Sequence, residues 1–199
     1  KLILLANNTN EWVLLNLDNE TIKPTTIDVS KLFPSASTNS GIFAGEIISA
    51  SWDSANEHVL LKVQNNNLIE WGLLDIRNFT RSTNLTREFA TTFTDVSILD
   101  HSADNLLAIR DGNLHKIDVN ARQISAVIVE GVLDYDFYDS EIIFVSKDQI
   151  GLLKLGQDTP AIVKEITGAT KVLIGKFYDN KYLYVIEEIQ ITVYQKNDF

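Results

Sequence analysis

Short apolar runs alternate with polar turns along the whole chain, and each run has the length of a β-strand. In residues 59–74, two apolar runs are separated by Asn65, Asn66 and Asn67, which is the spacing of a β-hairpin. Apolar residues are nowhere spaced at i, i+3, i+4 and i+7 over a helix-length stretch, so the pattern predicts no helix. The chain is therefore expected to be all-β.

One strand pattern recurs along the sequence. Residues 11–17 (EWVLLNL) and 70–76 (EWGLLDI) are near copies, and weaker copies occupy residues 113–119, 149–155 and 189–194. Most copies follow one another at close to the ~40–45 residues of a β-propeller blade. The longer first interval contains residues 34–41, which are rich in turn-forming residues and have no strand periodicity, so we expect a mobile, dispensable loop there.

The repeat predicts four-stranded antiparallel units, in which a polar turn leads into the second strand and a short hairpin turn leads into the third. Apolar segments such as residues 47–51 and 96–99 are expected to be the first strands. The expected fourth strands are residues 25–29, 85–89, 125–129 and 161–166. A two-sheet sandwich has similar strand spacing, but the near-identity of the two Glu-Trp strands favours repetition.

The predicted fold is therefore a β-propeller, or an open fragment of one, with four to five blades. Residues 1–199 are expected to form a single repeat domain, with approximate units 1–33, 45–90, 94–130, 132–166 and 171–199. Residues 2–6 match a second strand and residues 189–195 a third, so the first and last units are expected to be incomplete. The absence of methionine leads us to expect a piece of a longer protein.

Composition excludes several classes of function. The formal net charge of −10 argues against binding to nucleic acid or to an anionic membrane surface, both of which select basic proteins. The chain has no cysteine, which excludes disulfides and cysteine-ligated metals. Asn-x-Ser/Thr triplets, which are glycan acceptors in secreted eukaryotic proteins, begin at Asn7, Asn19, Asn78 and Asn84.

The stretch SWD…NEHVLLKV…NNLIEWGLLDIRN, residues 51–78, resembles TolB-like and WD-repeat propellers. With residues 85–89 (LTREF) and 113–125 (NLHKIDVNARQIS), it is similar to the propeller region of PEGA-domain-containing bacterial envelope proteins. The resemblance covers residues 45–145 well and the rest loosely. It implies a cell-envelope setting on the extracytoplasmic face, with a membrane anchor outside this chain. It supplies no catalytic residues.

Two groups of residues are candidates for a partner-binding rim. Trp12 and Trp71 occupy the same repeat position and are expected to pack inside the blades, whereas Trp52 has no counterpart and lies beside a turn with His58. The acidic group Asp134, Asp136 and Asp139 is the second candidate.

Metal binding is a weaker alternative at the same residues. Asp134 and Asp136 lie on one face of a strand and, with Asp139 and Glu141, offer oxygen ligands of the kind that calcium takes, but the EF-hand pattern is absent. His58 and His101 could share a metal with Asp53 or Asp100; solvated turn histidines are the simpler interpretation.

We therefore predict a non-catalytic binding or scaffold module that acts on the cell surface and has no cofactor. Its expected partner is a protein or another surface macromolecule, because blades form rigid rims on which loops vary freely. The alternatives are a hydrolase with carboxylates in a central channel, and a purely structural spacer. The sequence contains neither a Gly-x-Ser-x-Gly elbow nor the Asp-box of sialidases.

Overall fold

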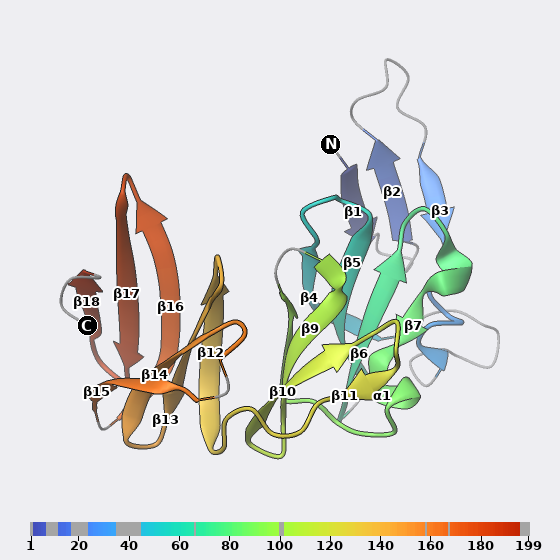
Figure 1. Cartoon of the computed structure of the whole chain (residues 1–199). Helices are drawn as coiled ribbons and strands as arrows, with labels where there is room; N and C mark the ends of the chain where they lie inside the picture. The colour runs from blue at the N-terminus through green and yellow to red at the C-terminus, as the bar shows by residue number, and fades with distance from the viewer. Residues whose placement is uncertain are drawn as a thin grey trace. The chain divides into compact units, whose positions relative to one another are not determined.

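The computed structural model describes the chain as a succession of short antiparallel strands (Figure 1). The described residues are 2–6, 12–16, 24–34, 45–65, 67–99, 102–157, 159–166 and 168–195. The chain divides into two compact units, which we call unit 1 (residues 1–103) and unit 2 (residues 104–199). The predicted loop at residues 34–41 lies outside the described residues except for Pro34.

Within the described residues, the strands form five antiparallel sheets in which consecutive strands are neighbours. The first sheet consists of β1 (Leu2–Ala6), β2 (Trp12–Asn16) and β3 (Thr25–Ile27). The second sheet consists of β4 (Glu46–Trp52), β5 (His58–Asn65), β6 (Leu68–Asp75) and β7 (Thr83–Asn84). The third sheet is β8 (Asp95–Leu99), β9 (Ser102–Arg110), β10 (Asn113–Asp118), β11 (Gln123–Ile124). The fourth sheet consists of β12 (Val132–Tyr138), β13 (Glu141–Ser146), β14 (Gln149–Lys154) and β15 (Ala161–Glu165). The fifth sheet consists of β16 (Ala169–Phe177), β17 (Asn180–Glu187) and β18 (Ile191–Gln195). This series of blade-like sheets confirms the all-β, β-propeller fold class.

The residue ranges of the five sheets can be compared with the predicted repeat units, which stay a prediction. Only the last sheet begins outside its unit, at Ala169 instead of residue 171. One predicted fourth strand is shorter than expected, since β3 ends at Ile27. The fourth strand predicted at residues 125–129 is wrong: the strand is β11 (Gln123–Ile124), and the following residues reach β10 only at an isolated bridge between Val129 and Leu114. The hairpin spacing therefore located the sheets better than it located their outer edges.

Residues 85–89 do not form the fourth strand of the second unit, which corrects the sequence prediction. That strand is β7, and the following residues form the short helix α1 (Leu85–Glu88). The Asn84 side chain accepts a hydrogen bond from the Arg87 backbone N–H, which caps the helix, and Leu85 is fully buried. With the 3-10 turn η2 (Phe79–Arg81), α1 accounts for the helix among the described residues, so the prediction that helix content is close to nil is confirmed.

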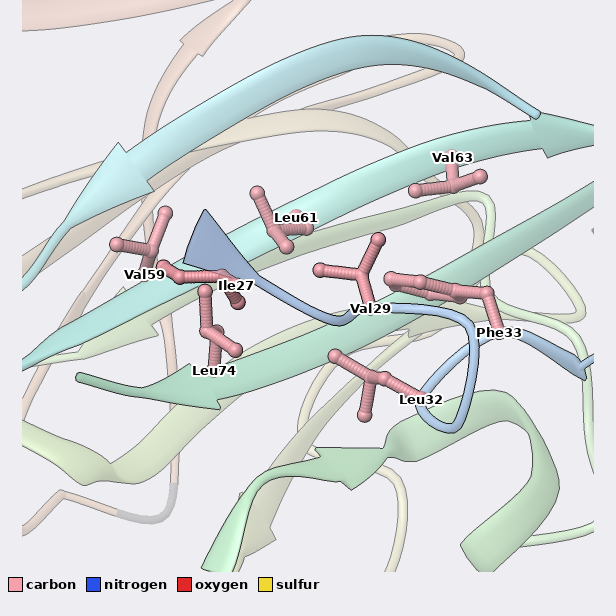
Figure 2. Packing of buried hydrophobic residues seen from close by; sticks show 8 residues of the cluster. All are labelled: Ile27, Val29, Leu32, Phe33, Val59, Leu61, Val63 and Leu74. Atoms are coloured by element: carbon pink, nitrogen blue, oxygen red, sulfur yellow. The ribbon is translucent and has the colours of Figure 1, made fainter. Parts of the chain in front are cut away.

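The core of unit 1 forms where the chain after β3 crosses the second sheet. Val29, Leu32 and Phe33 pack against β5 and β6, as Figure 2 shows. Their partners on β5 are Val59, Leu61 and Val63, which share one face of the strand because side chains alternate. The backbone N–H groups of Leu32 and Phe33 both donate to the Val29 carbonyl, so this segment makes a tight turn over the sheet.

Trp71 lies on the opposite face of the second sheet and is buried, as its repeat position predicted. Its side chain is 3% exposed, and the indole Nε1 donates to the Phe93 carbonyl oxygen at 3.1 Å. Lys62 lies over the ring, with its Nζ 5.0 Å from the ring centroid. The side chain of its predicted counterpart, Trp12, lies outside the described residues.

The core of unit 2 lies between its last two sheets. Ile143, Val145 and Ile150 from β13 and β14 face β16 and β17, whose contributions to the same cluster are Val172, Ile174, Leu183 and Val185. The alternation of buried and exposed residues along β16 shows that only one face of that strand is covered.

Candidate functional site

A groove opens in unit 1 between the segment that crosses the second sheet and the turns that precede α1. We call it the unit 1 groove. It has a volume of about 780 Å³ and is lined by Thr26, Asp28, Lys31, Leu32, Pro34, Leu74, Phe79, Thr80, Ser82, Thr83, Asn84, Arg87 and Glu88. Because the two walls are distant in sequence, the groove exists only where the tertiary packing around Phe33 holds them together.

A buried polar network joins the two walls at the base of the groove. Asn84 Nδ2 donates to the Leu32 carbonyl oxygen and to Glu70 Oε1, both at 3.0 Å. The Arg87 guanidinium contacts the same carboxylate oxygen through Nε at 3.3 Å. Glu70 is only 1% exposed, so these contacts supply the partners that a buried carboxylate requires. The network fixes the shape of the groove.

The rims of the groove are also held by local hydrogen bonds. Asp28 Oδ1 accepts bonds from the backbone N–H and the hydroxyl of Ser30. The hydroxyl bond lowers the pKa of Asp28, burial opposes this, and the backbone bond and Lys31 lower it further. Asp28 therefore stays ionised beside Lys31. On the other rim, Asn78 Oδ1 accepts from the backbone N–H and hydroxyl of Thr80.

The chemistry of the lining is that of a binding surface. Phe79 is 40% exposed and, with Pro34, offers apolar contact; Lys31 and Arg87 carry positive charge, and Asp28 and Glu88 carry negative charge. In the part of the chain that the structure describes, no three residues of His, Asp and Glu are grouped closely enough to hold a metal ion. The groove can thus contact both apolar and charged parts of a ligand.

The first group of predicted rim residues has structural partners. His58 Nδ1 lies 2.8 Å from Asp53 Oδ2, and His58 Nε2 lies 3.9 Å from Asp75. Asp53 also accepts backbone bonds from Glu57 and His58; burial raises its pKa, but these bonds and the His58 side chain outweigh burial and lower it. Trp52 is partly buried and packs against the core around Phe33.

The second group joins two sheets of unit 2. Asp134 Oδ2 accepts from the Val172 N–H at 3.0 Å, and Asp136 Oδ2 accepts from the Ile174 N–H at 2.8 Å. The two carboxylates point to the same side of β12, as predicted, but they contact the backbone of β16. Burial raises the pKa of Asp136, and the hydrogen bonds from Ile174 and Phe137 only partly offset it.

Asp139 forms an ion pair. Lys181 Nζ lies 3.0 Å from Asp139 Oδ2 and 3.0 Å from Glu141 Oε2, and it also lies over the Tyr138 ring. Burial lowers the pKa of Lys181, but the two carboxylates outweigh burial and raise it. Lys181 thus pairs with two of the four carboxylates of the calcium hypothesis, which stays a prediction. His101 and Asp100, from the other metal hypothesis, lie outside the described residues.

Of the five predicted rim residues, Trp52 and His58 belong to unit 1 and the three aspartates belong to unit 2. A role of these residues in partner binding stays a prediction.

Sequence reasoning did not find the unit 1 groove. The local sequence signals near the groove were the Asn-x-Ser/Thr triplets that begin at Asn78 and Asn84. The side chains of these two asparagines cap η2 and α1. Asn84 is buried, so it is not available for a glycan.

Comparison with known proteins supports the fold. No protein-family model matches the sequence, and no curated protein matches it. Three solved propeller structures are similar over nearly the whole chain. The first is PorZ, an essential bacterial surface component of the type-IX secretion system of Porphyromonas gingivalis, with a TM-score of 0.56 and 13% identity over 97% of this chain. The second is the N-terminal domain of Nup159, with a TM-score of 0.54 and 12% identity over 100% of this chain. The third is the dihydro-heme d1 dehydrogenase NirN, with a TM-score of 0.59 and 14% identity over 98% of this chain.

The fold is that of a β-propeller. At these identities the likeness shows the fold alone, and the three proteins have different functions. The chain spans 26% of the PorZ chain, 59% of the Nup159 chain and 42% of the NirN chain. Across the described residues, no helix is long and apolar enough to cross a membrane.

Proposed function

We propose that this chain is a non-catalytic binding or scaffold module, and that the unit 1 groove holds a segment of a protein partner. The observation that carries the proposal is the lining of the groove, in which the exposed ring of Phe79 is combined with charged side chains of both signs. Its volume of about 780 Å³ is within the ~300–1,000 Å³ of sites that enclose a ligand. The network around Asn84 supports a preformed site, which reduces the entropy lost on binding.

The contacts of the described histidines support a non-catalytic role. His58 Nδ1 is bonded to Asp53, and His115 Nδ1 lies 3.0 Å from the Ser125 carbonyl oxygen. Neither bond joins a histidine to a serine or threonine hydroxyl, which is the contact that a hydrolase uses to activate its nucleophile. These contacts bear on a serine-type hydrolase; the alternative with carboxylates in a central channel is addressed by the turnover test below.

The proposal includes a location on the extracytoplasmic face of the cell envelope, with an anchor outside this chain. Its support is the resemblance of residues 45–145 to the propeller region of PEGA-domain-containing envelope proteins. PorZ, a bacterial surface component, shares the fold. The expected partner is accordingly a protein or another macromolecule of the cell surface.

The test starts from capture. The full chain carrying a photoreactive phenylalanine analogue at position 79 is irradiated with surface proteins of the source cells, and cross-linked partners are identified by mass spectrometry. The affinity of the identified partner is then measured for wild type and for Phe79→Ala. We expect Phe79→Ala to weaken binding about tenfold, or about 1.4 kcal/mol, since a central aromatic contact typically contributes more than ~1 kcal/mol.

A matched control is Tyr178→Ala, which removes an aromatic side chain that is 82% exposed and lies outside the groove. It should leave the affinity unchanged. Equal affinities for Phe79→Ala and wild type would exclude the groove as the site. Turnover of an ester, glycoside or phosphate substrate by the wild-type chain would overturn the non-catalytic proposal, and absence of any partner would favour a spacer.

A further inference from the structure

A small hollow opens in unit 2 beside the turn that joins β16 to β17. Its volume is about 320 Å³, and the described residues that line it are Tyr138, Asp139, Lys176, Asp179, Asn180, Lys181 and Gln195. Apart from Tyr138, every one of these residues is polar or charged. The hollow therefore offers many hydrogen-bonding groups and little apolar surface.

The charged groups around the hollow are paired. Lys181 Nζ lies 3.0 Å from Asp139 Oδ2, and Lys176 Nζ lies 3.8 Å from Asp179 Oδ1. The lysines and aspartates of the lining therefore balance, although the whole chain has a formal net charge of −10. The lining presents N–H donors and carboxylate acceptors side by side. This combination suits a neutral ligand whose groups both donate and accept hydrogen bonds, as hydroxyl groups do.

An exposed aromatic pair lies in the turn itself. Phe177 is 63% exposed and Tyr178 is 82% exposed. The two rings meet edge to face, with their centroids 4.6 Å apart, so Phe177 supports the Tyr178 ring and leaves most of it accessible. Lys176 and Asp179, which flank the pair in the chain, both line the hollow. The aromatic pair therefore lies at the margin of the hollow.

The backbone at Tyr178 is a second, independent observation. Its φ of 53° lies in the left-handed region, which is unfavourable for a bulky side chain and is more often occupied by Gly, Asn or Asp. The first turn residue between β12 and β13, Asp139, has the same conformation with a φ of 55°. The Tyr178 ring is too exposed for packing to offset the strain. Strained residues cluster at functional sites, so this position indicates a function for the ring.

We propose that the hollow and the Tyr178 ring together bind a neutral glycan. A sugar ring has an apolar C–H face, which would stack on Tyr178, and a rim of hydroxyl groups, which would bond to Asp179, Asn180 and the two lysines. The volume of the hollow is at the lower end of the ~300–1,000 Å³ of ligand sites, which suits one sugar unit of a longer chain. The site lies in unit 2 and does not depend on the unit 1 groove.

Two other kinds of ligand match this turn less well. The Asp179 side chain is fully exposed beside the aromatic pair, so insertion of the pair into a bilayer would desolvate a carboxylate. A protein partner places its strongest contacts in pockets that lose their water on binding. This hollow is lined by charged and amide groups, which are costly to desolvate. The observations therefore favour a hydroxyl-rich ligand.

The test is affinity electrophoresis of the full chain in native gels that contain dextran, mannan, galactomannan or xyloglucan. We expect at least one of these neutral polysaccharides to retard the wild-type chain. Tyr178→Gly should weaken that binding at least tenfold, and it should be no less stable to urea because glycine suits the left-handed backbone. Tyr178→Phe keeps the ring and should bind like wild type. The matched control is Ile189→Ala, which truncates a 93% exposed side chain in the turn between β17 and β18, and it should also bind like wild type.

Several outcomes would overturn the proposal. Retardation by none of the four polysaccharides, or equal retardation of Tyr178→Gly and wild type, would exclude the glycan site. A Tyr178→Gly chain that binds weakly and is also less stable would show that the ring has a structural role. If no polysaccharide binds, cosedimentation of wild type but not Tyr178→Gly with phosphatidylcholine vesicles would assign the turn to a membrane surface. In the same case, a weaker affinity of Tyr178→Gly for the captured protein partner would assign it to that protein.

Discussion

The phenyl ring of Phe33 occupies the space in which Gly72 would otherwise carry a side chain. A Cβ atom at Gly72 would lie 2.5 Å from Phe33 Cζ and 3.2 Å from a Leu32 methyl carbon. Both residues are buried, so neither can move away from an added atom without repacking. Gly151, which occupies the same repeat position in β14, is covered in the same way by Phe144.

Gly72→Ala should therefore destabilise unit 1. Inserting a methyl group into a closely packed core typically costs about 1–3 kcal/mol. All three tryptophans, at positions 12, 52 and 71, lie in unit 1, so the urea midpoint followed by tryptophan fluorescence reports this unit. The control is Gly175→Ala in β16, where the nearest atom to a Cβ is 4.0 Å away. Because Gly175 lies in unit 2, which has no tryptophan, both variants are also followed by circular dichroism. Gly175→Ala should be neutral or stabilising by up to ~1 kcal/mol. A Gly72→Ala variant as stable as wild type would show that the ring is not fixed.

Asp136→Asn should remove a pH dependence of stability. Burial raises the pKa of Asp136, so the folded state binds a proton more readily than the unfolded state. The ionised group therefore reduces stability at neutral pH, and this cost disappears as the pH falls through the raised pKa toward the ordinary value of 3.8. Asparagine keeps an oxygen acceptor for the Ile174 N–H without the buried charge.

The difference in unfolding free energy between Asp136→Asn and wild type should thus favour the variant at pH 7 and shrink on acidification, as followed by circular dichroism. Asp136→Ala serves as the control, because it leaves the Ile174 N–H without its acceptor and should cost about 1–3 kcal/mol. A pH-independent difference for Asp136→Asn would contradict the assigned pKa direction.

Asp53→Asn should show the opposite sign. Burial raises the pKa of Asp53, but the bonds from His58 and Glu57 lower it overall. The carboxylate therefore stabilises the folded state above the ordinary value of 3.8, and the contribution is lost as the pH falls through the lowered pKa. At pH 7 the variant should be less stable by about 1.5 kcal/mol, the lower end for a hydrogen bond to a charged group. The loss should diminish below pH 3.8 in tryptophan-detected unfolding.

Asn84→Ala should weaken the joint between the two walls of the unit 1 groove. It removes the cap of α1 and both bonds from Nδ2, to Leu32 and to Glu70. Loss of a cap alone costs ~1 kcal/mol, and the buried Glu70 loses a partner as well, so we expect a loss above ~2 kcal/mol. Asn78→Ala, which removes only the cap of the exposed turn η2, is the matched control and should cost less. Equal losses in the two variants would mean that the network does not hold the groove.

The sequence predicted those parts of the fold that depend on local patterning. Alternation and turn residues located the strands, and the repeat predicted that Trp71 is buried. α1 was missed because its signal is the side chain of one residue, Asn84, which also heads a glycan triplet. The four residues of α1 are too few to show a helical period.

The candidate sites depend on contacts between distant segments, which no local pattern reveals. Asp134 and Asp136 were correctly expected on one face of a strand, but their partners are backbone groups of β16, 38 residues away. Likewise, Trp52 looks exposed in sequence because it stands beside a turn, yet the segment around Phe33 packs next to it. The unit 1 groove follows from that same packing.

The bonds from Asp134 and Asp136 have a consequence for how the two last sheets are aligned. Apolar faces such as those around Val172 and Ile143 permit sliding, because methyl groups fit one another at many offsets. Two carboxylates two residues apart face two N–H groups with the same spacing. A displacement by one residue would place both charges opposite backbone carbonyl oxygens, because the edge of a strand presents N–H and C=O groups in alternation. The pair therefore disfavours a one-residue slip between the two sheets, which the apolar contacts alone would tolerate.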